Sequence, residues 1–107
     1  MKFSATESTS GTSLQEYIDI SYDDLVNVLG EPHSDGDGYK TDAEWDLLFE
    51  DGTIATIYNY KTGKNYLGAE GVSLKEERDW HIGGFDKDSV MCIKLIFKDA
   101  KIEKSSW

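Results

Sequence analysis

The sequence is poor in cysteine, proline and histidine, and it lacks a long apolar segment. Its 107 residues include one cysteine, one proline and two histidines. A single cysteine forms no internal disulfide, and one cysteine with two distant histidines has no ligand-pair spacing for zinc. No stretch approaches the roughly 20 apolar residues of a membrane-spanning helix, and no basic segment followed by an apolar run opens the chain. We therefore expect a cytoplasmic chain without metal, cofactor or membrane contact.

Core-forming residues are plentiful by contrast. Hydrophobic residues make up 38% of the chain and aromatic residues 12%, which is too rich a content for a disordered chain. A chain of this length has the common size of one domain and no room for a second. We expect residues 1–107 to form a single domain.

Positive charge is scarce in the first part of the chain. The formal net charge is −10, and residues 1–60 hold 13 acidic residues against 2 lysines, whereas residues 61–107 hold 8 acidic residues against 9 Lys and Arg. A negative field repels a phosphate backbone over roughly 8 Å at physiological salt and attracts a basic protein. We expect no direct binding to nucleic acid. The alternative is that the acidity only keeps the protein soluble.

The N-terminal third predicts a hairpin followed by a short helix. Residues 1–10 and 14–20 alternate around a turn at Gly11 and predict two paired strands. Ser21 then provides an N-cap, and a Gly-Glu-Pro sequence at residues 30–32 ends the helix. The apolar face of this helix is formed by Leu25, Val28 and Leu29.

A second hairpin is predicted around Asp51-Gly52. Alternation over residues 44–50 predicts a strand, and Asp-Gly favours a two-residue type I′ turn. That turn pairs residues across the hairpin on one apolar face: Phe49 with Ile54, Leu47 with Thr56, and Trp45 with Tyr58.

The last part predicts a loop, a strand and a helix. Residues 61–77 lack periodicity, and residues 78–82 form a strand that ends at Gly83-Gly84. Residues 90–97 favour a helix capped by Ser89, with a buried strand as the alternative. The chain therefore predicts an α+β domain of order ββαβββα, in which two short helices pack on a small antiparallel sheet.

Two local motifs fail as established binding sites. Asp35 and Asp37 begin like a calcium loop, but Lys40 stands where that loop needs glycine. Lys61-Thr62-Gly63-Lys64 lacks the first glycine of a phosphate loop. The same basic segment could still hold a small nucleotide-like anion, using Lys61, Lys64, Tyr66, Trp80 and His81.

Asp79 and His81 project to the same side of one predicted strand. A carboxylate beside an imidazole is an arrangement that a general base uses, but no nucleophile stands near the pair in the sequence. The alternative is a pair without catalytic function at the end of a sheet. We assign no catalytic residues, and we interpret Cys92 as a small core residue.

The acidic residues of the first half are the main candidate site. We expect them to form one surface that binds a basic protein, with Asp23, Asp24, Asp35 and Asp37 essential for binding and dispensable for folding. The predicted residues are Asp19, Asp23, Asp24, Glu31, Asp35, Asp37, Asp42, Glu44 and Asp46.

The segments Asp51-Gly52-Thr53, Ile57-Tyr58-Asn59-Tyr60-Lys61 and Trp80-His81-Ile82-Gly83-Gly84 resemble small uncharacterised proteins encoded by bacteriophages. The resemblance covers a little over half of the chain and implies a viral origin and a place in the host cytoplasm. Small acidic phage proteins often neutralise host enzymes, including defence nucleases, by binding where nucleic acid would bind, and others sequester nucleotide messengers. The resemblance thus implies an acidic inhibitor of a basic host protein that mimics nucleic acid. The alternative is a binder of a small nucleotide-like anion, formed by one chain or at the interface of a homo-oligomer.

Overall fold

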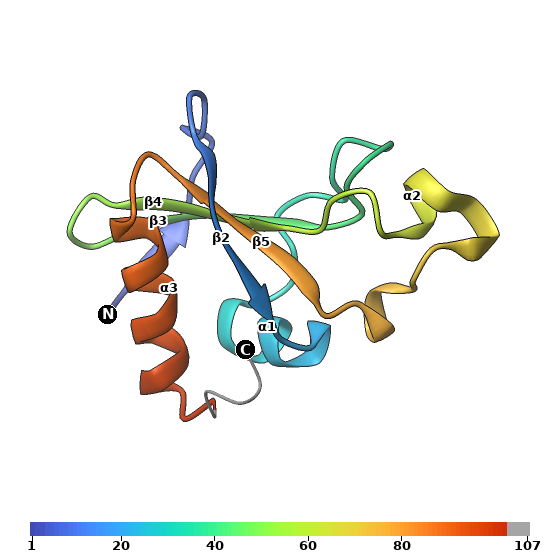
Figure 1. Cartoon of the computed structure of the whole chain (residues 1–107). Coiled ribbons are helices and arrows are strands. Elements are labelled where there is room, and N and C mark those ends of the chain that lie inside the picture. Colours follow the sequence, from blue (N-terminus) through green and yellow to red (C-terminus); the bar gives the residue numbers. More distant parts are fainter. Residues whose placement is uncertain (103–107) are drawn as a thin grey trace.

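The computed structural model describes residues 1–102 as a five-stranded antiparallel sheet with helices (Figure 1). The strands have the spatial order β1-β3-β4-β5-β2. Their bounds are β1 (Phe3–Ala5), β2 (Ser13–Asp19), β3 (Glu44–Phe49), β4 (Ile54–Tyr58) and β5 (Asp79–Gly84). The helices are α1 (Tyr22–Leu29), α2 (Lys64–Leu67) and α3 (Asp88–Asp99). This confirms the predicted α+β class, with the single turn α2 added between β4 and β5.

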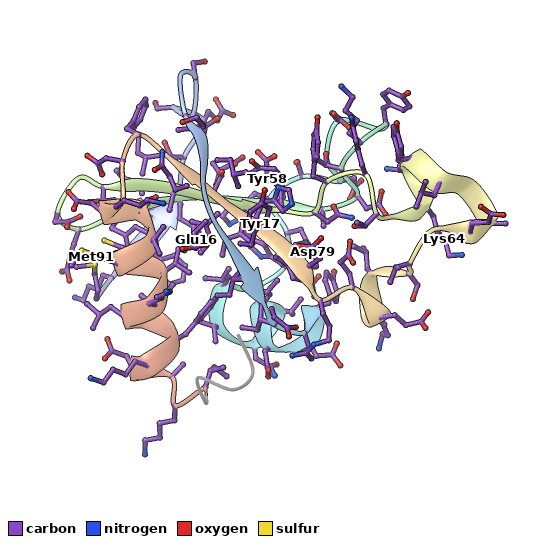
Figure 2. The ribbon with its side chains drawn as sticks, in the orientation of Figure 1. Glu16, Tyr17, Tyr58, Lys64, Asp79 and Met91 are labelled. Carbon is purple, nitrogen blue, oxygen red and sulfur yellow. The ribbon has the colours of Figure 1, made fainter. Side chains whose placement is uncertain are left out.

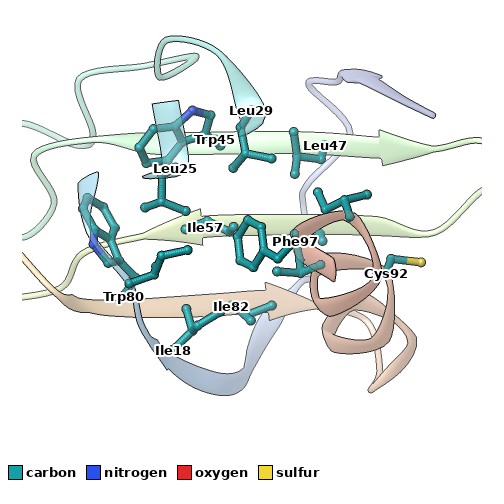
Figure 3. Close-up of a cluster of buried hydrophobic side chains, with 14 of the residues drawn as sticks. Ile18, Leu25, Leu29, Trp45, Leu47, Ile57, Trp80, Ile82, Cys92 and Phe97 are labelled. Atoms are coloured by element: carbon teal, nitrogen blue, oxygen red, sulfur yellow. The ribbon is translucent and has the colours of Figure 1, made fainter. Parts of the chain in front are cut away.

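The hydrophobic core lies on one face of the sheet, which we call the inner face. Side chains alternate along each strand, and the inner face buries Trp45, Ile57, Trp80 and Ile82 with no exposed area. α1 and α3 pack against these side chains, and Phe97 of α3 lies among them (Figure 3). The opposite side of the sheet is the outer face.

Local signals define α1 as predicted. The side chain of Ser21 accepts the Asp24 N–H at 3.1 Å, and the helix ends at Gly30, whose N–H donates to the Val26 carbonyl. Leu25 and Leu29 are buried in the core. The predicted helix boundaries are confirmed.

The predicted register of the second hairpin is wrong by one residue. The structure pairs Leu48 with Ile54 and Trp45 with Ile57. A type I′ turn needs a positive φ at both central residues, but among the described residues only Lys61 and Lys101 have one without being glycine, so Asp51 does not. Its carboxylate instead accepts the Thr53 N–H at 2.9 Å.

The turn consequently uses three residues, 50–52, instead of two. The Gly52 N–H donates to the Phe49 carbonyl, and Gly52 takes the positive φ of 89° that such a bulged turn needs. A shift of one residue exchanges the two faces of a strand. Ala55 and Ile57 therefore face the core, and Tyr58 faces outward.

The predicted hairpin between the first two strands is also wrong. β1 pairs with β3 and β2 pairs with β5, so they lie at opposite edges of the sheet (Figure 1). Packing decides this placement, because the Phe3 ring lies 6.0 Å from the Phe49 ring and Ile18 is buried opposite Trp80. Residues 6–12 connect the two edges.

The prediction that the strand ends before its two glycines is wrong, because β5 includes both of them. Gly83 pairs with Thr56 and Gly84 pairs with Ala55. A Cβ atom on Gly84 would lie 2.4 Å from the Cβ of Ser89. The missing side chain therefore lets the first turn of α3 pack directly on the strand.

α3 confirms the predicted helix over residues 90–97 and extends it at both ends. Val90, Ile93 and Phe97 are buried, as the predicted stripe requires, and Cys92 is buried beside them. Ser89 is not the cap. It is buried, and its hydroxyl donates to the Asp86 carbonyl at 2.8 Å.

The predicted loop at residues 61–77 contains short turns of helix. α2 is followed by the 3-10 turns η1 (Gly68–Glu70) and η2 (Leu74–Glu76). A bridge between Gly63 and Val72 closes the segment. Its base is fixed by the buried Glu77, which accepts a hydrogen bond from the Thr62 hydroxyl.

Candidate binding face of the sheet

Strand register places four chemically active side chains in one row across the outer face. Glu44 of β3 is opposite Tyr58 of β4, Tyr58 is opposite His81 of β5, and His81 is opposite Tyr17 of β2. Neither α1 nor α3 covers this side, because both pack on the inner face. The row is therefore the centre of the outer face.

His81 is enclosed by three tyrosine rings. Its ring centroid lies 4.8 Å from that of Tyr17, in an edge-on arrangement, 5.3 Å from Tyr58 and 5.8 Å from Tyr60. Only 8% of His81 is exposed, whereas Tyr17 is 59% exposed. Burial lowers the pKa of His81 below its usual value, against the charges of Asp79 and Glu77, which raise it. The neutral imidazole therefore serves as a packing surface for the three tyrosine rings.

Glu44 and Asp46 form a carboxyl pair beside this row. They are two residues apart on β3 and so face the same side. Burial raises the pKa of Glu44 to about 8, with contributions from a hydrogen bond to Asp46 and from the charges of Asp46 and Asp37. Within the described residues, Asp46 Oδ1 is buried without a hydrogen-bond partner. The raised pKa keeps a proton on Glu44 near neutral pH, and Glu44 can donate it to the Asp46 side chain.

The ring contacts continue from the centre of the face to one end of the molecule. Lys61 Nζ lies 5.3 Å from the Tyr60 ring centroid and 5.6 Å from that of Tyr66, and Tyr66 lies 5.2 Å from Tyr39. Five of the six tyrosines thus form one connected series, which we call the tyrosine stripe: Tyr17, Tyr39, Tyr58, Tyr60 and Tyr66.

The structure brings together some residues of the predicted anion site and separates others. Lys61 and Tyr66 are in contact, and Tyr60 links them to His81. Lys64 is exposed on α2, toward the end of the molecule and away from Tyr17 and Tyr58 (Figure 2). Trp80 cannot contribute to a surface site here, because its side chain is fully buried on the inner face.

The predicted acidic residues do not form one surface. Glu44 and Asp46 lie on the outer face, whereas Asp23 and Asp24 lie on α1, which packs on the inner face. Glu31 and Asp35 are exposed in the segment between α1 and β3.

Three further acidic residues already have partners in the fold. Asp19 is bonded to Arg78 at 2.7 Å. Asp42 accepts the N–H groups of Lys64 and Asn65 and so caps α2. Asp37 accepts the N–H groups of Tyr39, Lys40 and Thr41, which lowers its pKa to about 2. The expectation that Asp37 is dispensable for folding therefore conflicts with its role in the loop.

Asp79 and His81 lie on the outer side of β5, with Trp80 and Ile82 on the inner side, as the alternation predicts. His81, however, makes its close ring contacts with tyrosines. Within residues 1–102, no three His, Cys, Asp or Glu side chains are placed to hold a metal ion. No helix in the same residues is long and apolar enough to cross a membrane.

Comparison of the chain with protein-family models, with curated proteins and with solved structures finds no match. The assignment of the candidate site therefore rests on the geometry of its side chains. The sequence alone did not identify Tyr17, Tyr39 and Tyr58 as site residues. The signal for Tyr58 was its alternation with Ile57 and Asn59, which points it outward once the hairpin turn has three residues.

Proposed function

We propose that this protein is a non-catalytic binding protein that docks its outer face on a basic host protein and blocks the partner's nucleic-acid site. The observation that supports this most strongly is the row from Glu44 to Tyr17 on the side of the sheet without α1 or α3. The resemblance to phage proteins favours a bacterial enzyme as the partner, including a defence or nucleic-acid enzyme.

The chemistry of the outer face suits a protein partner. Tyrosine provides a large rigid contact area with a polar tip, and it is enriched at protein interfaces and among their strongest contacts. Tyr17, Tyr39, Tyr60 and Tyr66 are each at least 37% exposed. Carboxylates beside aromatic rings favour Lys and Arg, and the net charge of −10 steers a basic protein toward the face.

The test is an affinity capture from bacterial lysate at low and high salt. The wild-type chain should retain a basic protein that salt releases. The double variant Glu44→Gln/Asp46→Asn should retain at least about tenfold less, because a charge pair in a desolvated interface contributes about 1.5 kcal/mol or more.

The matched control is Asp23→Asn/Asp24→Asn, which likewise replaces two acidic side chains by amides, but on α1. It removes more charge at neutral pH, since Glu44 is then protonated. The proposal expects capture by this variant to stay close to wild type. Stronger loss in the α1 variant than in the β3 variant would contradict the outer face as the docking surface.

A second candidate is a small nucleotide-like anion held at Lys61. Its support is the position of the ammonium group between Tyr60 and Tyr66, whose rings could stack on a base. Lys61→Met should abolish nucleotide binding measured by calorimetry, and Lys64→Met, at an exposed lysine outside this contact, should leave it unchanged. Equal loss in both variants would contradict a specific site.

A further inference from the structure

β2 is the longer of the two edge strands, and Lys87 Nζ donates to its Gln15 carbonyl near the start. Within residues 1–102 it pairs only with β5, at one end of the sheet, and β1 at the other end has three residues. A bulge interrupts β2 between Leu14 and Glu16, and from Glu16 to Asp19 the pairing with β5 is regular. Leu14 and Tyr17 are 42% and 59% exposed on this strand.

The hydrogen-bond direction along β2 identifies which backbone groups point away from β5. The Ile20 N–H donates to the Arg78 carbonyl, and in an antiparallel pair the bonded residues alternate. The backbone N–H and C=O groups of Ile18 therefore point toward β5, whereas those of Tyr17 and Asp19 point away from it. Consistent with this, the Tyr17 N–H donates to Glu16 Oε1 at 3.0 Å. The half-buried Glu16 side chain therefore occupies a position that a neighbouring strand would otherwise take.

A shallow hollow of about 480 Å³ lies along the same residues. Tyr17, Ile18 and Asp19 line it together with Arg78 and Asp79. Its side chains include two carboxylates and one guanidinium, and Arg78 is bonded to Asp19. A lysine or arginine on the outer side of an added strand would lie near Asp79 and Tyr17, whereas the apolar residue next to it would point to the inner side, beside Ile18.

We propose that the basic partner adds an extended segment to β2 as a sixth strand, with alternating basic and apolar side chains. The inference rests on the proposed docking to a basic protein and names its mode. Main-chain hydrogen bonds to Tyr17 and Asp19 provide affinity, and the acidic hollow selects the basic residues. Because β2 borders the row that contains Tyr17 and His81, an added strand extends the outer face without a break.

The test uses a short capped peptide in which lysine and valine alternate. Its binding to the full chain is followed by amide hydrogen exchange and by calorimetry. The peptide should slow exchange of the Tyr17 and Asp19 amides. Asp19→Pro removes the outward N–H without removing a bond to β5, and it should bind the peptide about tenfold more weakly than Asp19→Ala.

The Asp19→Ala variant is the matched control, because both variants lose the carboxylate and its bond to Arg78. Equal affinity of the two, or unchanged exchange at Tyr17 and Asp19 in the wild-type chain, would overturn strand addition. The exchange measurement decides the question even if the proline variant does not fold.

The two proposals fail separately. If Glu44→Gln/Asp46→Asn abolishes capture of the lysate protein while Tyr17 and Asp19 exchange normally in that complex, the outer face is the docking surface and strand addition is wrong. If the peptide adds to β2 but the Glu44→Gln/Asp46→Asn variant captures as much lysate protein as the wild-type chain, strand addition is supported and the outer face is not the docking surface.

Discussion

At the scale of single residues, the Glu44–Asp46 pair links protonation to stability. The folded-state pKa of Glu44, about 8, lies above its usual value of 4.5. A raised carboxyl pKa means that the folded state binds the proton more tightly than the unfolded state. The stabilisation is complete below pH 4.5 and is lost as the pH rises through about 8.

We expect the melting temperature to show this loss. Between about pH 5 and pH 8.5 the wild-type chain should lose stability relative to Glu44→Gln, which cannot ionise. Burial lowers the pKa of His81, but His81 is present in both chains, so the difference between their thermal unfolding curves reports on Glu44. Parallel pH profiles would show that Glu44 keeps an ordinary pKa.

Asp37 has the opposite environment and the opposite pH dependence. Three backbone N–H groups bond to its carboxylate, and its pKa falls to about 2. A lowered pKa contributes stability above the usual value of 3.8, and this contribution is lost as the pH falls through about 2.

Asp37→Ala should therefore lower the melting temperature at neutral pH, because the N–H groups of residues 39–41 lose their acceptor. Asp35→Ala is the control, since Asp35 is an exposed acid of the same loop. Thermal unfolding of both variants gives the comparison. Equal melting temperatures would show that the carboxylate of Asp37 does not organise the loop.

At the scale of elements, the contact between β5 and α3 depends on the absence of a side chain at Gly84. An added Cβ atom would lie 2.4 Å from both Cβ and Oγ of Ser89 and 3.2 Å from the Ile54 carbonyl oxygen. Backbone and a buried helix residue cannot move away as a flexible side chain would. We expect Gly84→Ala to destabilise the fold by about 1–3 kcal/mol, the usual cost of overpacking.

Urea unfolding measures this cost, and a second substitution tests its cause. Ser89→Gly removes the atoms that the new methyl group would meet. In a double-mutant cycle, Gly84→Ala should therefore cost less in the Ser89→Gly background than in the wild-type chain. Additive effects would mean that Ser89 is not the source of the strain.

A helix whose cap, apolar face and terminal glycine all lie within its own segment was predictable from the sequence. The pairing of the strands was not. α1 has a serine cap, two buried leucines and a glycine end within ten residues, so its boundaries follow from local chemistry. The β3–β4 register depends on a three-residue turn, in which Asp51 accepts the Thr53 N–H and Gly52 takes a positive φ. The edge positions of β1 and β2 depend on contacts distant in sequence, between Phe3 and Phe49 and between Ile18 and Trp80.

At the scale of the whole molecule, the fold divides the acidic residues between the two sides of the sheet and connects five of the tyrosines in one series. The sequence showed that acidic residues are concentrated before residue 60, but it could not show that α1 carries Asp23 and Asp24 on the opposite side from Glu44 and Asp46. The tyrosine stripe requires the register of β2, β4 and β5 at once, because His81 of β5 links Tyr17 to Tyr58. Its other members lie in α2 and in the segments before β3 and α2, so no local pattern contains it.

The most direct test of the proposed docking is side-chain footprinting with hydroxyl radicals, with and without the captured basic protein. Tyr17 is 59% exposed on the outer face, and Met91 is 69% exposed on α3, on the other side of the sheet (Figure 2). Both side chains should be oxidised in the free chain. The complex should protect Tyr17 and Tyr60 and leave Met91 as reactive as before. Protection of Met91 with Tyr17 and Tyr60 still reactive would contradict the outer face as the binding surface.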